Sequence, residues 1–232
     1  MQRHLCLLEK DFEKLGDIMK KIVLVGGGGH CKVIIDIIRS IAEYEITGIT
    51  GKHNIGQGIL GIPVIGDDEI LKDLRNNGVD YAFICIGAID NIQTREKIYY
   101  RLKEIGFKIP VLIHRHAIVS PYASIEEGTC VMPGAVVNPS AYIGKNCIIN
   151  TSSVIEHDCV IEDNTHISPK SVLGGGVKVG KNSHIGIGST IIQGIKIGNN
   201  VTIGAGAVVI DDIPDNSIAV GVPARVIKTK QL

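Results

Sequence analysis

Two stretches of this 232-residue sequence carry residue types that can do chemistry. In one of them His157 is followed directly by Asp158. Imidazole is suited to removing a proton near neutral pH, and an adjacent carboxylate can fix its tautomer and stabilise the imidazolium. In the other, four consecutive glycines at 26–29 precede His30. A glycine-rich turn that opens a helix offers backbone N–H groups to a phosphate, so the two stretches indicate a general base and an anion-binding turn.

Both motifs also have purely structural explanations. An exposed histidine is common on a repetitive surface, and a histidine can begin a helix without contacting a ligand. The glycine run also resembles a dinucleotide-binding fingerprint, but Cys31 replaces the third glycine and no acidic residue ends the next expected strand. We therefore do not expect a nicotinamide dinucleotide.

Composition excludes several classes of protein. The 24 Lys and Arg balance 24 Asp and Glu, so the chain has no electrostatic footprint for duplex nucleic acid. No apolar run approaches the ~20 residues needed to cross a bilayer, and acidic residues interrupt residues 1–18, which excludes a signal peptide. The six cysteines form no CxxC pair and are expected as reduced thiols. We expect a cytoplasmic protein with neither nucleic-acid nor membrane partners.

The first half of the chain has the alternation of a parallel α/β sheet. Short apolar runs predict strands at 22–25, 45–49 and 82–86, the first of them ending in the glycine turn. Helical spacing predicts helices at 33–41, 67–76 and 91–105. Residues 19–21, Met-Lys-Lys, look like a second natural beginning of the protein chain. Residues 1–18 are therefore expected to form a weakly structured extension.

The second half has a period of six residues. Every sixth residue from Ile113 to Val209 is Ile, Leu or Val, and four residues after each aliphatic the chain mostly carries a small one. This period requires a corner at every repeat, so three faces form one coil of three hexads, and the coils stack by parallel pairing about 4.8 Å apart. Cys147 and Cys159 occupy small positions, which favours packing over chemistry.

The hexads, together with GGGGH at 26–30, NTSSVIEHD at 150–158 and GVPAR at 221–225, resemble a known family. They are similar to the hexapeptide-repeat sugar acetyltransferases, in the NeuD/PglD-like group of UDP-4-amino-sugar N-acetyltransferases and sialic acid O-acetyltransferases. The resemblance covers about residues 20–226 and implies a left-handed parallel β-helix. The expected organisation is an extension (1–18), a Rossmann-like nucleotide-sugar-binding α/β domain (19–109) and a β-helix acetyltransferase domain with a closing segment (110–232).

The resemblance also implies a homotrimer that holds acetyl-CoA, the acetyl donor, in the groove between adjacent prisms. It makes His157 the general base, Asp158 its acidic partner, and His166 the residue that contacts the acetyl end of the cofactor. As the third residue of its hexad, His157 is expected on a face between corners, pointing outward. Gly175 lies one coil further along and leaves room for pantetheine, with backbone amides near the oxyanion. A glycine bulge without a ligand is the alternative.

The same resemblance assigns the nucleotide-sugar substrate to Gly28, Gly29, His30, Thr50 and Gly87.

A metal site is the competing interpretation of the histidines. His166 and His184 hold the same position in successive coils and should stack on one face, and some hexapeptide-repeat proteins bind zinc through three histidines. The closely spaced histidine pair of those proteins is absent here, so we expect no metal.

The sequence therefore predicts acetyl transfer from acetyl-CoA to the amino group of a nucleotide-linked 4-amino-4,6-dideoxy sugar, with UDP as the expected nucleotide, in bacterial surface glycan biosynthesis. O-acetylation of a sialic-type sugar is the alternative reaction. A non-catalytic β-helix scaffold or nucleotide sensor is the alternative of another class.

Overall fold

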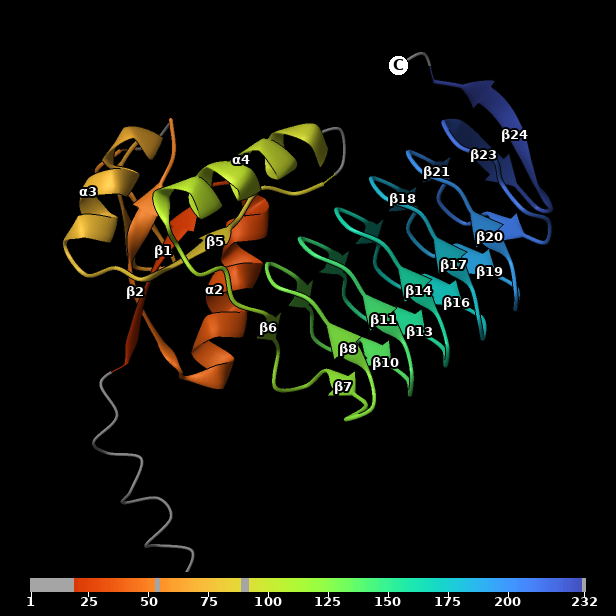
Figure 1. Cartoon of the computed structure of the whole chain (residues 1–232), viewed down its shortest axis with the longest axis horizontal. Helices are drawn as coiled ribbons and strands as arrows, with labels where there is room; N and C mark the ends of the chain where they lie inside the picture. Colours follow the sequence, from red (N-terminus) through yellow and green to blue (C-terminus); the bar gives the residue numbers. More distant parts are fainter. Residues whose placement is uncertain (1–18, 53–54, 89–91, 231–232) are drawn as a thin grey trace, which may run out of the picture.

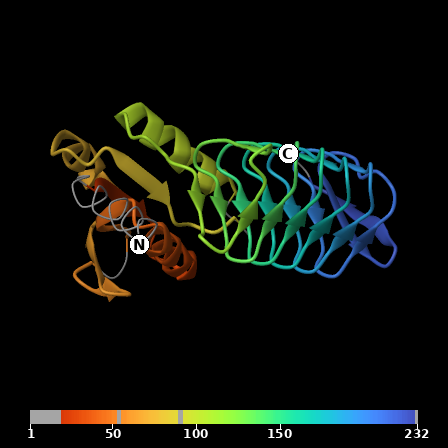
Figure 2. The ribbon, with the colours of Figure 1, turned by 90° about the horizontal axis from the view of Figure 1, so that it is seen from below.

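A computed structural model of the chain describes residues 19–52, 55–88 and 92–230. An α/β domain stands at one end of a long three-sided prism, and the coils of the prism stack away from it (Figures 1 and 2). The expected extension at 1–18 lies outside the described residues. Among the described residues, none of the helices combines the length and the apolar character needed to cross a membrane.

The amino-terminal domain is built on a five-stranded sheet in the order β3-β4-β2-β1-β5. Strand β1 pairs in parallel with both β2 and β5, and its last four residues are buried because helices cover the sheet. The elements are β1 (Lys20–Val25), α2 (Gly29–Ile41), β2 (Tyr44–Thr50), β3 (Gly58–Ile59), β4 (Ile62–Gly66), η2 (Asp68–Ile70), α3 (Leu71–Asn76), β5 (Tyr81–Ile84) and α4 (Ile92–Ile105).

The expected strands and helices of this domain are present, with two differences. The helix expected at 67–76 begins as a 3-10 turn, η2, because the Asp67 side chain accepts a hydrogen bond from the Glu69 N–H and caps that turn. The antiparallel pair β3–β4 was not predicted. Its turn consists of Leu60 and Gly61, both at positive φ (49° and 81°).

The prism has three sheets whose strands are parallel and two residues long, except for the closing hairpin of β23 and β24 in the third sheet. The first sheet contains β7 (Ile118–Val119), β10 (Val136–Val137), β13 (Val154–Ile155), β16 (Val172–Leu173), β19 (Thr190–Ile191) and β22 (Val208–Val209). The second contains β8 (Ser124–Ile125), β11 (Tyr142–Ile143), β14 (Val160–Ile161), β17 (Lys178–Val179) and β20 (Lys196–Ile197). The third contains β6 (Leu112–Ile113), β9 (Cys130–Val131), β12 (Ile148–Ile149), β15 (His166–Ile167), β18 (His184–Ile185), β21 (Thr202–Ile203), β23 (Ser217–Gly221) and β24 (Ala224–Thr229).

The six-residue period therefore produced the expected three-sided parallel β-helix. Each strand pairs with the strand one full coil later, as Val137 does with Ile155 and Ile155 with Leu173. These aliphatic residues fill the interior, and the small positions are buried as well, including Cys147 and Cys159.

The last coil departs from the period. Thr202 pairs with Ile218, whereas an unbroken period would have placed Val220 opposite it. Strand β23 then turns back into β24, which pairs with it in antiparallel fashion. This hairpin ends the stack of coils and returns the chain toward the corner between the second and third sheets.

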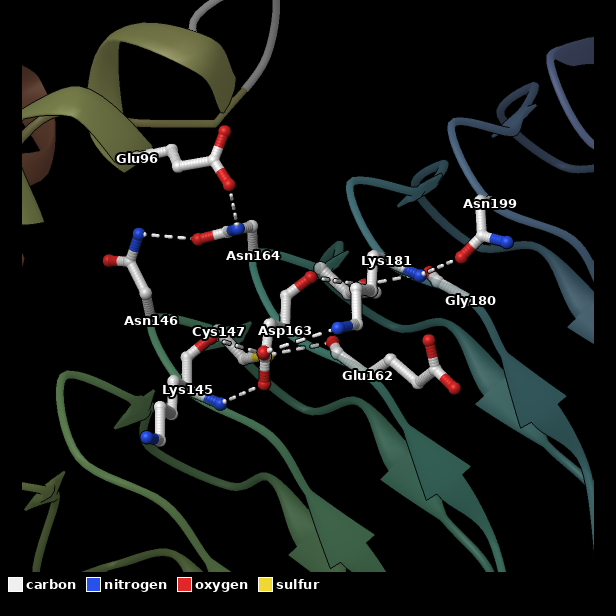
Figure 3. Close-up of polar contacts among 11 residues, drawn as sticks. Glu96, Lys145, Asn146, Cys147, Glu162, Asp163, Asn164, Gly180, Lys181 and Asn199 are labelled. Atoms are coloured by element: carbon white, nitrogen blue, oxygen red, sulfur yellow. Dashed lines mark hydrogen bonds and ion pairs between the residues drawn. The ribbon is translucent and has the colours of Figure 1, made fainter. Parts of the chain in front are cut away.

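The two domains share a continuous core. Leu112, Cys130, Met132 and Ile148, all from the first coils of the prism, belong to the same buried cluster as the amino-terminal sheet. Beside this cluster α4 contacts the corner of the prism, where the Asn164 amide donates to Glu96 Oε1 at 2.9 Å (Figure 3).

Arg95 of α4 is the charged residue inside this junction. Its guanidinium is 1% exposed and donates to four carbonyl oxygens: those of Ile84 and Ile86 at 2.9 Å, and those of Gly128 and Asn146 at 3.4 Å. Ile84 is the last residue of β5 and Ile86 follows that strand, whereas Gly128 and Asn146 belong to the prism. The buried charge is therefore solvated by backbone of both domains, which joins them.

Replacing Arg95 with Met should lower the free energy of unfolding by about 3 kcal/mol or more, because four carbonyls at the junction lose their donor. Replacing Arg95 with Lys should lower the free energy of unfolding by less than Met does, but still below that of the parent, since lysine lacks the planar fork of donors. Urea unfolding measures the difference. The control is Arg101→Met, which removes one exposed hydrogen bond to Asp68; equal small losses for both variants would contradict this account.

Candidate functional site

His157 lies in a corner of the prism, between β13 and β14, and not on a flat face as its place in the hexad had suggested. The reason is that each strand holds only two residues, the aliphatic and the residue before it. The second residue after Ile155 therefore already belongs to the turn. The expected outward direction is correct, since the His157 side chain is 63% exposed.

His157 and Asp158 form a hydrogen-bonded pair. The imidazole Nδ1 lies 2.7 Å from Asp158 Oδ2, and Asp158 adopts the left-handed conformation (φ 61°) that closes the corner. This hydrogen bond raises the pKa of His157, and the charges of Asp158 and Glu156 raise it further. When the ring is neutral, Nδ1–H donates to the carboxylate and Nε2 keeps a lone pair that can accept a proton.

Gly175 lies directly beside the free nitrogen of His157, as the coil length predicts. A Cβ atom at residue 175 would be 2.6 Å from His157 Nε2, so only glycine leaves the ring in its place. In the same corner the Gly176 N–H donates to the His157 carbonyl at 2.9 Å.

His166 has a different environment, because it lies on the third sheet and is only 4% exposed. The Asn150 Oδ1 accepts the Thr151 N–H, which orients the amide so that Asn150 Nδ2 donates to His166 Nε2 at 3.0 Å. The proton of the neutral ring is therefore on Nδ1, which has no hydrogen-bond partner among the described residues. Burial, followed by the charges of His184, His30 and Arg95, lowers the pKa of His166 to about 3.

His166 and His184 stack as expected. Their ring centroids are 5.1 Å apart and their planes differ by 17°. The His184 Nε2 is 2.8 Å from Ser168 Oγ, so this ring also has a polar neighbour on its own sheet. In the part of the chain that the structure describes, no three His, Cys, Asp or Glu side chains gather as metal ligands would.

The glycine turn lies where β1 ends and α2 begins. Gly26 (φ 106°) approaches β5 closely, since a Cβ there would be 2.7 Å from Ile86 Cγ1. Gly28, Gly29 and Gly87 in contrast face open space, with no atom within 4 Å of an added Cβ. Gly28 caps α2 without a side-chain hydrogen bond, so the amino end of the helix is open toward the carboxyl edge of the sheet.

His30 and Thr50 lie on either side of this turn, in different roles. His30 Nε2 is enclosed and has no hydrogen-bond partner in the described part of the chain, and burial together with the Arg95 charge lowers the pKa of His30 to about 3. Thr50 is fully buried; its hydroxyl donates to Asp68 at 2.7 Å and its carbonyl accepts the Gly26 N–H at 2.8 Å. Thr50 therefore stabilises the glycine turn through its hydrogen bond to the Gly26 backbone.

A cleft of about 540 Å³ lies between the amino end of α4 and the third sheet. Its walls are mostly polar and were not predicted as a set. The lining residues are Ala88, Ile92, Gln93, Thr94, Asn182, His184, Asn200, Thr202, Ile218 and Lys230. Asn182 and Asn200 hold matching positions in successive coils, and so do His184 and Thr202. The 18-residue spacing of these two pairs is the sequence signal from which this part of the cleft wall could have been predicted.

The structure thus brings some of the expected residues together and leaves others apart. His30 lies near enough to His166 for its charge to lower the pKa of that ring, although the two come from different domains. His157 stands at the corner between the first and second sheets, whereas His166 is on the third. Within one protomer His157 and His166 therefore lie on different parts of the prism.

Models of two protein families match the chain. The PglD N-terminal domain matches residues 21–102. The bacterial transferase hexapeptide (six repeats) matches 122–157, 140–175, 158–193 and 176–211. Together the two models span more than half of the chain.

Similar proteins include enzymes and solved structures. The UDP-N-acetylbacillosamine N-acetyltransferase of Bacillus subtilis (strain 168) is 38% identical over 115 residues, 49% of this chain and 52% of that protein, so the match spans about half of the relative's length. PerB from Caulobacter crescentus, solved with CoA and GDP-perosamine, is 38% identical with a TM-score of 0.86, covering 91% of this chain and 99% of PerB. The acetyltransferase domain of PglB from Neisseria gonorrhoeae FA1090, solved with acetyl coenzyme A, is 36% identical with a TM-score of 0.85, covering 90% and 100%.

Replacing Asp158 with Asn should lower the pKa of His157, because the hydrogen-bonded negative charge that favours the imidazolium is lost. The neutral ring then persists to lower pH than in the parent protein. An NMR titration of the histidine ring protons measures this shift. Asp163→Asn, a change at another corner of the prism, should leave the titration unchanged; an unaltered His157 in Asp158→Asn would refute the pairing.

Proposed function

Because the chain belongs to the hexapeptide-repeat sugar acetyltransferases, we propose that it transfers acetyl from acetyl-CoA to the amino group of a nucleotide-linked 4-amino-4,6-dideoxy sugar. The observation that carries the proposal is the fusion, in one chain, of a PglD-type domain with a prism that bears the His157–Asp158 pair. The relatives named for UDP-N-acetylbacillosamine and solved with GDP-perosamine support this substrate class. UDP is the nucleotide we propose, and surface glycan synthesis the setting.

His157 acts as the general base of this reaction. The sugar nitrogen attacks the thioester carbonyl carbon, the new C–N bond forms, and the amine proton passes to His157 Nε2. The tetrahedral intermediate then collapses, the C–S bond breaks, and the CoA thiolate takes up the proton. Asp158 holds the other ring nitrogen throughout and stabilises the imidazolium that forms.

His166 contacts the acetyl end of the donor. Its low pKa keeps the ring neutral, and its Nδ1–H, which has no partner within the described residues, is a donor suited to the thioester oxygen. Gly175 keeps the space beside His157 Nε2 open for the pantetheine arm. The two histidines therefore divide the work: the exposed one accepts a proton and the buried one donates a hydrogen bond.

The amino-terminal domain holds the nucleotide sugar at the carboxyl edge of its sheet. Gly28, Gly29 and Gly87 leave room for a diphosphate near the open end of α2, and His30 offers a neutral imidazole toward the third sheet. Thr50 contributes by fixing the Gly26 turn.

The active unit is a homotrimer. The outward side chains of the first sheet form an apolar stripe along most of the prism, which suits burial against a second copy. Its residues are Ile118, Val136, Val154, Val172 and Val208, interrupted by Thr190. The second sheet instead presents Lys178 and Lys196.

A trimer also completes the site. In a threefold assembly around an axis parallel to the prism, equivalent coils lie at the same height. His157 and His166 belong to one coil, half a coil apart along the chain. The corner with His157 of one protomer can therefore meet the third sheet with His166 of the next.

The cytoplasm is the compartment we propose. Cys31, Cys85, Cys130, Cys147 and Cys159 are all free thiols, which suits a reducing environment.

Release of CoA with a panel of nucleotide-linked sugars tests the function. We expect turnover with a 4-amino-4,6-dideoxy sugar on UDP, and His157→Ala should lower kcat by about 10² to 10⁴. The matched control is His116→Ala, an exposed corner histidine outside the site, which should retain activity. Turnover of sialic-type sugars alone would establish O-acetylation instead, and no turnover with any sugar would favour a scaffold or sensor.

A further inference from the structure

The end of the described chain brings a cation into the cleft. After β24 the Lys230 N–H donates to the Asn216 carbonyl at 2.6 Å, which fixes the backbone at the last corner of the prism. The Lys230 side chain then extends back over one coil, and its Nζ lies 3.2 Å from Asn200 Oδ1. Lys230 thereby becomes part of the cleft wall together with Asn200 and Thr202.

Among the described residues, no counter-charge lies near this ammonium group. Within residues 19–52, 55–88 and 92–230, no carboxylate lies within 4.0 Å of Lys230 Nζ. The side chain is part-buried, and this burial lowers the pKa of Lys230. An amide oxygen solvates the charge but does not neutralise it, so an anion that entered the cleft would find a partly desolvated cation.

The position of Lys230 along the prism indicates which anion it meets. The third sheet presents His166, His184 and Thr202 on successive coils, so Thr202 is about 10 Å beyond His166. An acyl donor whose thioester lies at His166 extends its pantetheine arm along the third sheet, past His184 and Thr202. The phosphate groups that follow the arm then arrive at the far end of the cleft, where Lys230 stands. We assign the diphosphate of the nucleotide sugar to the glycine turn, whose Gly87 precedes Ala88 in the cleft wall, and titration with UDP distinguishes the two anions.

We propose that Lys230 binds a phosphate group of the acyl donor and so sets the affinity for CoA. This inference rests on the proposed function, because it takes the donor to be CoA with its thioester at His166. Lys230 serves ground-state binding and lies away from the reacting atoms. Its loss should therefore raise the KM for acetyl-CoA and leave kcat nearly unchanged.

Calorimetric titration of the full-length protein tests this without turnover. Lys230→Met should weaken CoA binding about tenfold, while Lys230→Arg, which keeps the charge, should bind within about twofold of the parent. Pantetheine, which has no phosphate, should bind both proteins equally. The matched control is Lys228→Met on the same strand, an exposed lysine that should leave CoA affinity unchanged.

Three results would overturn the inference, and a fourth would overturn the proposed function on which it rests. Equal losses for CoA and pantetheine would show that Lys230 only shapes the cleft, and a loss for UDP alone would assign its charge to the nucleotide sugar. A parent protein that binds no CoA at all would instead refute the proposed function. Normal CoA binding by Lys230→Met would refute the role of Lys230 and leave the function standing.

Discussion

The geometry of the candidate site depends on a buried guanidinium group that has no carboxylate partner among the described residues. Arg95 donates to backbone carbonyls at the end of β5 and at the first corners of the prism, so the edge of the amino-terminal sheet is held at one place against the third sheet. His30 at the start of α2 and His166 on β15 belong to the two domains that Arg95 joins. The positive charge of Arg95 also lowers the pKa of both rings. Arg95 therefore joins the two domains and adds to the effect of burial, which is the main reason that both rings stay neutral.

The same residue type acquires opposite properties at the two ends of the site. His157 is exposed beside Asp158, which raises the pKa of its ring, whereas burial and neighbouring positive charge lower the pKa of His166. A proton acceptor and a neutral hydrogen-bond donor are the two groups that acyl transfer to an amine requires. The prism separates them onto a corner and a face, and the proposed homotrimer would bring them together.

Much of this architecture can be read from the sequence because the hexads repeat one local rule. The period fixes the coil length, the buried small positions and the stacking of Gly175 beside His157. Other features depend on local strand length, chain reversal and contacts between the domains, which the six-residue period does not encode. The corner position of His157 follows from strands only two residues long, and Lys230 reaches the cleft because the last coil is two residues shorter and a hairpin follows. Arg95 was not recognised because an arginine in an amphipathic helix normally faces solvent, and its four acceptors come from both domains.

We propose that each site combines His157 of one protomer with His30 and His166 of its neighbour. The most direct test of this proposal mixes two impaired chains, His157→Ala and His30→Ala, under conditions of subunit exchange. In random mixed assemblies one site in four combines an intact His157 with an intact His30 from different chains, so about a quarter of parent activity should return. If the mixture instead shows no more activity than the average of the two variants, each site lies within a single protomer and the account is wrong.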